Sequence, residues 1–377
     1  MLKISAENKK WVDEVWERAD KKLKNVAPRS KNKIPYTTIN GVHNDKQEND
    51  ICWWTNGFFA GLMWLMYIDT KNDIYKDAAE NNELLLDGAL AEYDGLHHDV
   101  GFMWHISSGV NYRLFGGKKS RVRTITAANI LSARYNEKGK FIRAWNHDCY
   151  GWAIIDCMMN IPLLYWASRE INDPRYSFIA QNHADTTMEN HIRPDGSVNH
   201  ILVYDHLNGE GLLESRGGQG ICEGSSWSRG QAWALYGFVL SYIHTQNQAY
   251  LDTAKRVAHY FIANVCDDYL PKCDFRAPDE PVIYDSTAGA IAACGLIEIA
   301  KNVPEHEQKL YMNGAINILK ALEKNFCNWE ENEDSILGMG TEAYNSNETG
   351  RHIPIIYGDF YFVEALYKLR GNDMLFW

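Results

Sequence analysis

The chain has 377 residues, with 49 acidic against 38 basic side chains and a formal net charge of -11. Nucleic acid is bound by clustered Lys and Arg, so this acidic balance argues against it as a general partner. The first residues hold no apolar run of signal-peptide length, and no stretch reaches the roughly 18 uninterrupted apolar residues of a membrane span. The 8 cysteines are scattered without a CxxC pair, which is typical of reduced thiols. We therefore expect a cytoplasmic protein that does not enter a membrane.

Helical periodicity dominates the chain, and strand alternation is scarce. Helices are predicted over residues 57–69, 74–90, 156–170, 176–191, 228–242, 250–265, 287–300, 308–325 and 360–369. Short strands are predicted only at 197–204 and around 281–284. No linker or low-complexity stretch divides the sequence, so we expect one domain over residues 1–377.

A loose repeat relates these segments to one another. A nearly all-apolar helix is followed by a polar turn, a Tyr and an amphipathic helix, as at the turns 70–75, 172–176 and 245–250. A helix that is apolar all round must be buried, whereas an amphipathic helix faces water on one side. The apolar helices are expected to begin near Gly57, Gly101, Asp156, Ser228, Thr287 and Phe360. These hairpins predict an all-α (α/α)6 barrel, and an open superhelical solenoid is the alternative.

Closure of the ring would bring the residues that start the inner helices to one mouth of the barrel. They are Trp54, Asp99, Asp156, Arg229, Asp285 and Asp359. Carboxylates, an aromatic ring and an Arg gathered at one mouth are typical of a binding site.

Asp156 precedes a run of Ile, Met and Leu residues, and burial among such residues favours the neutral, proton-donating form of a carboxyl. The competing interpretation is a helix-capping aspartate. Asp99 follows His97 and His98. Adjacent histidines rarely converge on one ion and no HExxH pattern exists, so we expect hydrogen bonding or proton transfer and no metal. A buried polar network in a loop is the alternative.

The segment 217–233 is rich in glycine and then enters a helix that carries Arg229 and Trp233 four residues apart, on one face. Arg suits a carboxylate and Trp suits the flat face of a sugar. The glycines do not fit a phosphate-binding loop, because the spacing of Lys and the preceding strand are absent. A tight loop with a cation–π pair remains the structural alternative.

Taken together, these segments resemble family 88 of the glycoside hydrolases, the unsaturated glucuronyl hydrolases. The matching segments, in family order, are 54–58, 97–102, 155–164, 224–233, 285–296 and 358–361. The resemblance implies the (α/α)6 barrel, and a reaction that hydrates the C4=C5 double bond of a 4,5-unsaturated uronic acid at the non-reducing end of a di- or oligosaccharide. It also implies that neither a metal nor an organic cofactor takes part.

By the same resemblance, Asp156 is the general acid and base, and Asp99 is the second essential carboxylate. The residues that it places around the substrate are Trp54, His98, Trp145, His200, Gln219, Arg229, Trp233 and Tyr344. Some streptococcal members carry a Ser- and Lys-containing stretch that favours sulfated disaccharides. The corresponding segment 345–354 has no Lys, and Tyr357 stands where the family usually has Trp.

Three other functions compete with this one. The first is removal of unsaturated galacturonic acid from rhamnogalacturonan fragments, as in the related family 105. The second is inverting hydrolysis of a saturated sugar with Asp99 and Asp156 as an acid/base pair. The third is binding of sugar without catalysis. The sequence leaves open whether the chain is a monomer or a homodimer.

Overall fold

The computed structural model describes residues 4–209 and 211–377, and most of them are helical. The α-helices are α1 (Ala6–Ser30), α2 (Phe58–Thr70), α3 (Asp73–Leu85), α4 (Asp87–Glu92), α5 (Val100–Trp104), α6 (Ser108–Phe115), α7 (Lys118–Ala133), α8 (Pro162–Ile171), α9 (Arg175–Asn190), α10 (Ser228–Thr245), α11 (Gln248–Val265), α12 (Ser286–Asn302), α13 (Glu305–Phe326) and α14 (Ile356–Leu369). Short 3₁₀ turns occupy η1 (Lys46–Glu48), η2 (Ile155–Met159) and η3 (Glu348–Gly350).

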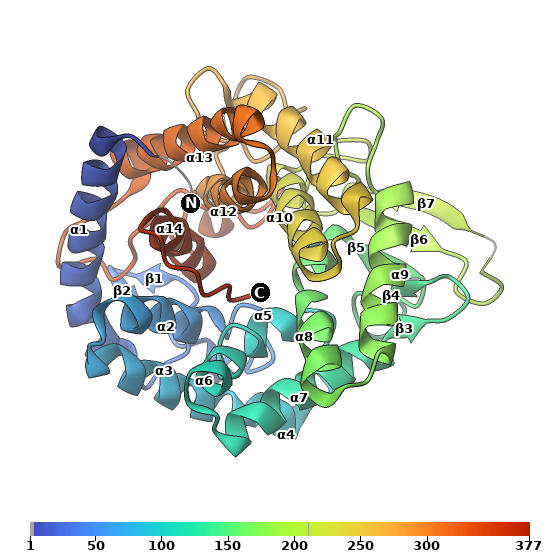
Figure 1. The fold of residues 1–377 in the computed structure, drawn as a ribbon, viewed down its shortest axis with the longest axis horizontal. Coiled ribbons are helices and arrows are strands. Elements are labelled where there is room, and N and C mark those ends of the chain that lie inside the picture. The colour runs from blue at the N-terminus through green and yellow to red at the C-terminus, as the bar shows by residue number, and fades with distance from the viewer. Residues whose placement is uncertain (1–3, 210) are drawn as a thin grey trace.

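The helices form two concentric layers (Figure 1). The inner helices α2, α6, α8, α10, α12 and α14 pair with the outer helices α3, α7, α9, α11, α13 and α1, in that order. The last pair joins the two ends of the chain, and α14 also packs against α2. That contact closes the ring, so the fold is the predicted (α/α)6 barrel and the solenoid alternative is wrong.

The burial of each layer follows from its sequence. In α2, every residue from Phe58 to Met66 is buried, as expected for a helix that is apolar all round. Its outer partner α3 buries only one face, including Tyr75 and Ala78. The turn between them uses Lys71 in the left-handed region, where its backbone N–H caps the helix by bonding to the carbonyl of Tyr67.

The strands are short, with two to five residues each, and pair only with one another. They pair as β1 (Thr38–Ile39) with β2 (Val42–His43), β3 (Tyr135–Asn136) with β4 (Phe141–Ile142), and β5 (Trp152–Ile154) with β6 (Ile201–Tyr204) and β7 (Leu212–Arg216). All pairs are antiparallel. Within residues 4–209 and 211–377, no helix combines the length and the apolar character needed to cross a membrane.

Several sequence-based boundaries differ from the structure. Asp156 does not open a long helix: it lies in η2, and α8 begins only at Pro162, whose fixed φ suits a first helical position. The predicted helix 74–90 is divided into α3 and α4 at Leu86. The predicted strand at 281–284 is only a single bridge between Lys272 and Tyr284.

Two long outer helices, α1 and α7, are missing from the sequence prediction. In α1 the buried stripe, which includes Val12, Trp16 and Leu23, is diluted by many Lys and Glu residues on the solvent side. In α7 the buried positions include Ser120, Arg123 and Thr124, so apolar periodicity has little to detect.

Candidate active site

One cavity, of about 300 Å³, lies where the inner helices begin and gathers most of the predicted site residues. It is lined by Asp50, Cys52, Trp53, Trp54, Gly95, His97, His98, Asp99, Trp145, Ile154, Asp156, Gln219 and Arg229. These residues come from six separate stretches of the chain, and ring closure brings them together. The size suits a small ligand rather than a polymer.

Asp99 is the N-terminal flanking residue of α5, and its carboxyl points away from that helix and makes no cap bond. The amide of Asn160 donates to Asp99 Oδ1 over 2.9 Å and to the backbone carbonyl of Asp156 over 3.3 Å. Asn160 therefore links the two carboxyl-bearing segments. Gly101 permits this approach, because a Cβ there would lie 2.7 Å from Asn160 Oδ1.

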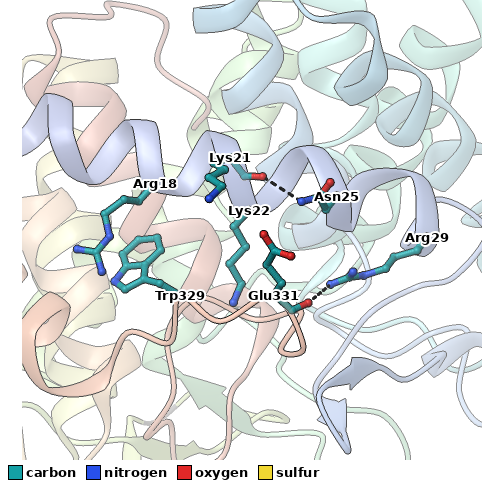
Figure 2. Close-up of a pocket in the computed structure, with 7 residues that line it drawn as sticks. All are labelled: Arg18, Lys21, Lys22, Asn25, Arg29, Trp329 and Glu331. Carbon is teal, nitrogen blue, oxygen red and sulfur yellow. Dashed lines mark hydrogen bonds between the residues drawn. The ribbon is translucent and has the colours of Figure 1, made fainter.

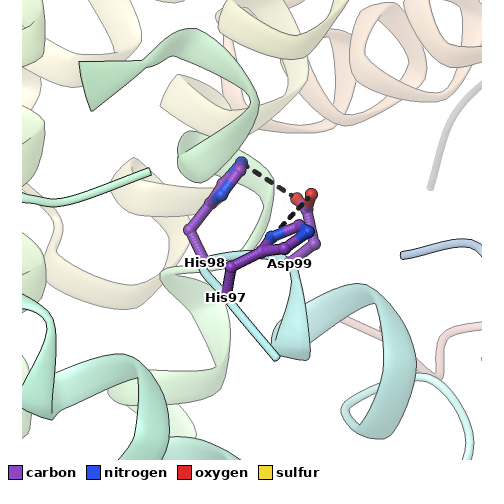
Figure 3. Close-up of side chains that lie close together, drawn as sticks. All are labelled: His97, His98 and Asp99. Carbon is purple, nitrogen blue, oxygen red and sulfur yellow. Dashed lines mark ion pairs between the residues drawn. The ribbon is translucent and has the colours of Figure 1, made fainter. Parts of the chain in front are cut away.

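Two histidines converge on Asp99 (Figure 3). His97 Nδ1 lies 3.5 Å from Oδ2, and His98 Nε2 lies 3.3 Å from Oδ1. His98 Nδ1 is 2.9 Å from the carbonyl oxygen of Ala144, which can only accept, so Nδ1 carries the proton and Nε2 is an acceptor. An acceptor facing Asp99 favours the protonated carboxyl, which can donate to it.

Burial dominates the titration of this cluster. It raises the pKa of Asp99 well above its ordinary value, with a further contribution from Asp156, while the Asn160 hydrogen bond opposes the shift. Burial also lowers the pKa of His98 well below its ordinary value, and that of His97 to about 4. Both rings are therefore neutral at pH 7.

The histidine beside Asp156 is His200, and it differs from His98 in the nitrogen that carries the ring proton. The backbone N–H of Gln219 donates to His200 Nδ1 over 2.9 Å, and the carbonyl oxygen of Gly217 lies 3.2 Å from the same nitrogen. The Gln219 contact is the shorter and its donor is fixed, so we place the ring proton on Nε2, which lies 3.6 Å from Asp156 Oδ2. His200 can thus present an N–H to this carboxylate, the reverse of His98. Asp156 Oδ2 is buried and has no hydrogen-bond partner among the described residues, although both Asp99 and Asp156 line the cavity. Asp156 is therefore not a helix cap.

Arg229 supplies the cation of the cavity. Its guanidinium is 1% exposed and pairs with Asp285, the residue that precedes α12. It also donates to the backbone carbonyls of Thr341 and Glu342, each over 2.6 Å. Nε has no partner among the described residues. Gln219 shares the Glu342 carbonyl, to which its side chain donates over 2.6 Å.

The predicted aromatic residues separate into three positions. Trp54 and Trp145 line the cavity, and Trp145 meets His98 edge to face with the ring centroids 5.8 Å apart. Trp233 is fully buried beneath the wall, 5.2 Å from Phe102, whose ring lies 5.4 Å from that of Trp54. Tyr344 is buried, and its backbone N–H donates to the carbonyl of Gln219. A direct substrate contact by Trp233 or Tyr344 stays a prediction.

The ligand atoms of His97, His98 and Asp99 lie within 4.8 Å of one another, a separation that a metal ion could bridge. His98 is held through its other nitrogen, Nδ1, by Ala144, and Asp99 is held by Asn160. His97 Nδ1 and His98 Nε2 have no hydrogen-bond partner among the described residues. The expectation that no metal takes part stays a prediction.

A different cavity, of about 180 Å³, lies between α1 and the segment around Trp329 (Figure 2). Three of the four cations that line it already have protein partners. Arg18 bonds to Glu323 over 2.6 Å, Lys22 donates to the carbonyls of Asn328 and Glu330, and Arg29 pairs with Asp334. No carboxyl pair comparable to Asp99 and Asp156 lines it, so we do not assign the chemistry here.

Sequence reasoning missed several residues that organise the site. Asn160 lies four residues after Asp156 in an apolar run, which is a detectable signal for a shared buried face. Asp285 was expected at the mouth but without a role. Nothing in the local sequence distinguishes Arg134, whose guanidinium holds the loop that carries Trp145.

Comparison with known proteins gives a consistent result. Residues 26–272 match the family described as Glycosyl Hydrolase Family 88. The unsaturated glucuronyl hydrolase of Bacillus sp. strain GL1 is 34% identical over 340 residues, which is 87% of this chain and 89% of that protein. The unsaturated chondroitin disaccharide hydrolase of Streptococcus pneumoniae is 34% identical over 337 residues, covering 86% and 83% of the two chains.

The fold agrees with these relatives. A crystal structure of unsaturated glucuronyl hydrolase from Streptococcus agalactiae superimposes with a TM-score of 0.89 at 31% identity, over 98% of this chain and 94% of that one. With a family match over more than half of its length, relatives above 30% identity and the same barrel, this chain belongs to glycosyl hydrolase family 88.

Proposed function

We propose that this protein is an unsaturated glucuronyl hydrolase, which releases 4,5-unsaturated glucuronic acid from the non-reducing end of lyase-generated glycosaminoglycan oligosaccharides. The observation that carries the proposal is the pair of buried carboxyls, Asp99 and Asp156, that meets in one cavity without a Lys or Arg hydrogen bond to either among the described residues. Family membership and the printed activities of the relatives support it.

The chemistry requires one proton to be added and another to be removed. Asp156 protonates C4 of the vinyl ether, which leaves an oxocarbenium-like centre at C5. The Asp156 carboxylate then takes a proton from the water that attacks C5. The hemiketal so formed collapses, which opens the ring and releases the rest of the sugar. A single carboxyl therefore acts first as acid and then as base.

Asp99 supplies the second member of a coupled pair. Its pKa is raised by burial and by Asp156, and His98 offers it an acceptor. The raised pKa of Asp99 favours its protonated form, so the cavity that holds Asp156 also holds a second proton donor.

The remaining cavity residues are assigned to binding. Arg229, which keeps one buried N–H without a partner, attracts the uronic carboxylate. Trp54 and Trp145 offer ring faces to the sugar. His200 and Gln219 hold the wall beside Asp156. We further propose that residues 1–377 act as one catalytic domain, in the cytoplasm, as a monomer or a homodimer.

The direct test is a spectrophotometric assay. Incubation with an unsaturated chondroitin or hyaluronan disaccharide should remove the ultraviolet absorbance of the conjugated double bond, and Asp156→Asn should not. Unsaturated rhamnogalacturonan fragments serve as the competing substrate, and faster loss on them would transfer the assignment to that activity. Persistence of the absorbance on every unsaturated substrate, with tight binding of the disaccharide, would leave a sugar-binding protein instead.

A further inference from the structure

The guanidinium of Arg134, the residue directly after α7, donates hydrogen bonds to four consecutive residues of one loop, 143–146. Nε donates to the carbonyl of Arg143 over 2.9 Å, and Nη1 donates to Asn146 Oδ1 over 2.8 Å. Nη2 donates to the carbonyls of Ala144 and Trp145, over 2.8 and 2.7 Å. Four acceptors on consecutive residues are thus fixed by one planar fork, which matches the five donors of a guanidinium.

Two of these loop residues, Trp145 and Ala144, contribute to the active site. Trp145 lines the cavity. The carbonyl of Ala144 accepts from Arg134 and also from His98 Nδ1, so one oxygen joins the guanidinium to the imidazole that faces Asp99 (Figure 3).

Asn146 completes the connection to the loop that carries His97, His98 and Asp99. Its amide donates to the carbonyls of Asp94 over 2.9 Å and of Leu96 over 3.1 Å. The loop that carries His97, His98 and Asp99 and the loop that carries Trp145 are therefore tied together through Asn146 and Arg134.

The surroundings of Arg134 do not resemble those of a stabilising ion pair. Its hydrogen-bond acceptors among the described residues are carbonyl and amide oxygens, and no carboxylate contacts it. Burial, together with the neighbouring Arg143, lowers the pKa of Arg134 to about 10. Nearby acidic groups, Asp99 among them, offset this burial only in part and make no hydrogen bond to Arg134, which suggests that its geometry serves the site.

We propose that Arg134 is a positioning residue of the active site. It fixes the ring of Trp145 against the sugar, and it holds His98 in the tautomer whose Nε2 can accept a hydrogen bond from protonated Asp99. This inference rests on the proposed function. A Lys in this position would keep the charge but could not reproduce the planar fork of the guanidinium. We therefore expect that the charge alone does not hold Trp145 and His98 in place.

The test compares Arg134→Gln and Arg134→Lys with Arg113→Gln. Arg113 is a matched control because it also donates to backbone carbonyls, those of Gly109, His105, Leu375 and Phe376, but lines no part of the cavity. We expect kcat/KM of Arg134→Gln to fall about 100-fold, with both a raised KM and a lowered kcat, as for a small misplacement of reacting groups. Arg134→Lys should lose about 10-fold, because it keeps the charge but not the fork. Arg113→Gln should keep the kcat and KM of the parent.

A second measurement does not depend on turnover. In ¹⁵N-histidine NMR spectra of the whole protein, the His98 signal, assigned with His98→Gln, should show protonated Nδ1 in the parent and in Arg113→Gln. In Arg134→Gln and Arg134→Lys it should shift toward a mixture of tautomers. If the parent turns over no unsaturated sugar, the proposed function fails while this NMR comparison still decides the role of Arg134. Unchanged kinetics with an unchanged His98 signal in both Arg134 variants, or equal losses in Arg113→Gln, would overturn the proposal.

Discussion

The two ends of the barrel both bury ionisable groups, but they neutralise them differently. At the end of α12 and α14 remote from the cavity, Lys368 Nζ lies 2.6 Å from Glu298 and 3.6 Å from Glu364. At the mouth, Asp99 and Asp156 have imidazoles and an amide as partners. Asp285 and Glu298 lie at opposite ends of one helix, about 20 Å apart at 1.5 Å per residue.

The contrast teaches which buried carboxyls are free to titrate. Burial opposes ionisation of Glu298, but Lys368 and Lys301 outweigh it, so the pKa of Glu298 is lowered and the group stays a carboxylate. Asp99 lacks such a cation within hydrogen-bonding distance among the described residues, and its pKa is raised. At the far end Lys368 thus keeps the nearer carboxyl, Glu298, ionised, while burial still raises the pKa of Glu364, which lies farther from Lys368. At the mouth no such cation bonds to Asp99, and its raised pKa favours the protonated form.

The largest effect is expected from Asp156→Asn at the mouth. Loss of the group that donates and accepts the proton should lower kcat about 10⁴-fold, the upper range for general acid–base catalysis. The absorbance assay measures this. The matched amide substitution is Glu364→Gln, at the barrel end remote from the cavity. The folded variant should retain activity within a few-fold of the parent. A comparable loss of kcat in Glu364→Gln would remove the distinction between the two ends.

Asp99→Asn should lower kcat about 10³-fold. An Asn cannot ionise, and the atom that replaces Oδ1 can either donate to His98 Nε2 or accept from Asn160, so one of these two contacts is lost at every pH. Because the folded pKa of Asp99 is raised, its ionisation costs stability as pH rises through that pKa, and the cost is absent below the unfolded value of about 4.

The Tm of Asp99→Asn relative to the parent should therefore rise by a degree or more between pH 4 and pH 8, since about 1 kcal/mol corresponds to roughly 1–2 °C in a chain of 377 residues. Thermal unfolding at several pH values checks this. A relative Tm that falls between pH 4 and pH 8 would show that Asp99 is held as a carboxylate.

Lys368→Met should act on stability instead of catalysis. It leaves Glu298 and Glu364 buried without their shared cation, which costs about 3 kcal/mol. Urea unfolding should show a lower midpoint, and kcat and KM of the folded protein should match the parent. A large fall in kcat without a change in the unfolding midpoint would contradict the separation of the two ends.

The smallest effect is expected from Trp54→Ala, which removes one aromatic wall of the cavity. KM for the unsaturated disaccharide should rise about 10-fold, a loss near 1.4 kcal/mol, while kcat changes little. Trp233→Phe changes a buried residue beneath the cavity wall, and it tests whether only the aromatic residues that line the cavity affect KM. Equal KM effects in both variants would indicate that Trp233 also contacts the sugar.

The barrel and the carboxyl pair were accessible from sequence because their signals are local. A helix that is apolar all round, such as α2, is predicted to be buried from its sequence alone, and Asp156 is a charged residue within an apolar run. The partners of these groups were not accessible, since Ala144 and Arg134 contribute through backbone carbonyls and loop geometry that no side-chain pattern encodes. The outer helix α7 was missed for a related reason, because three of its seven buried residues are polar.

The most direct test of the central claim is to run the reaction in D₂O and follow the sugar by proton NMR. If the carboxyl pair protonates the double bond, the vinyl proton signal at C4 should disappear, deuterium should be found at C4 of the released keto sugar, and Asp156→Asn should show neither change. Release of an intact unsaturated uronic acid, with its vinyl signal and absorbance preserved, would mean that the glycosidic bond is cleaved directly and would contradict the account.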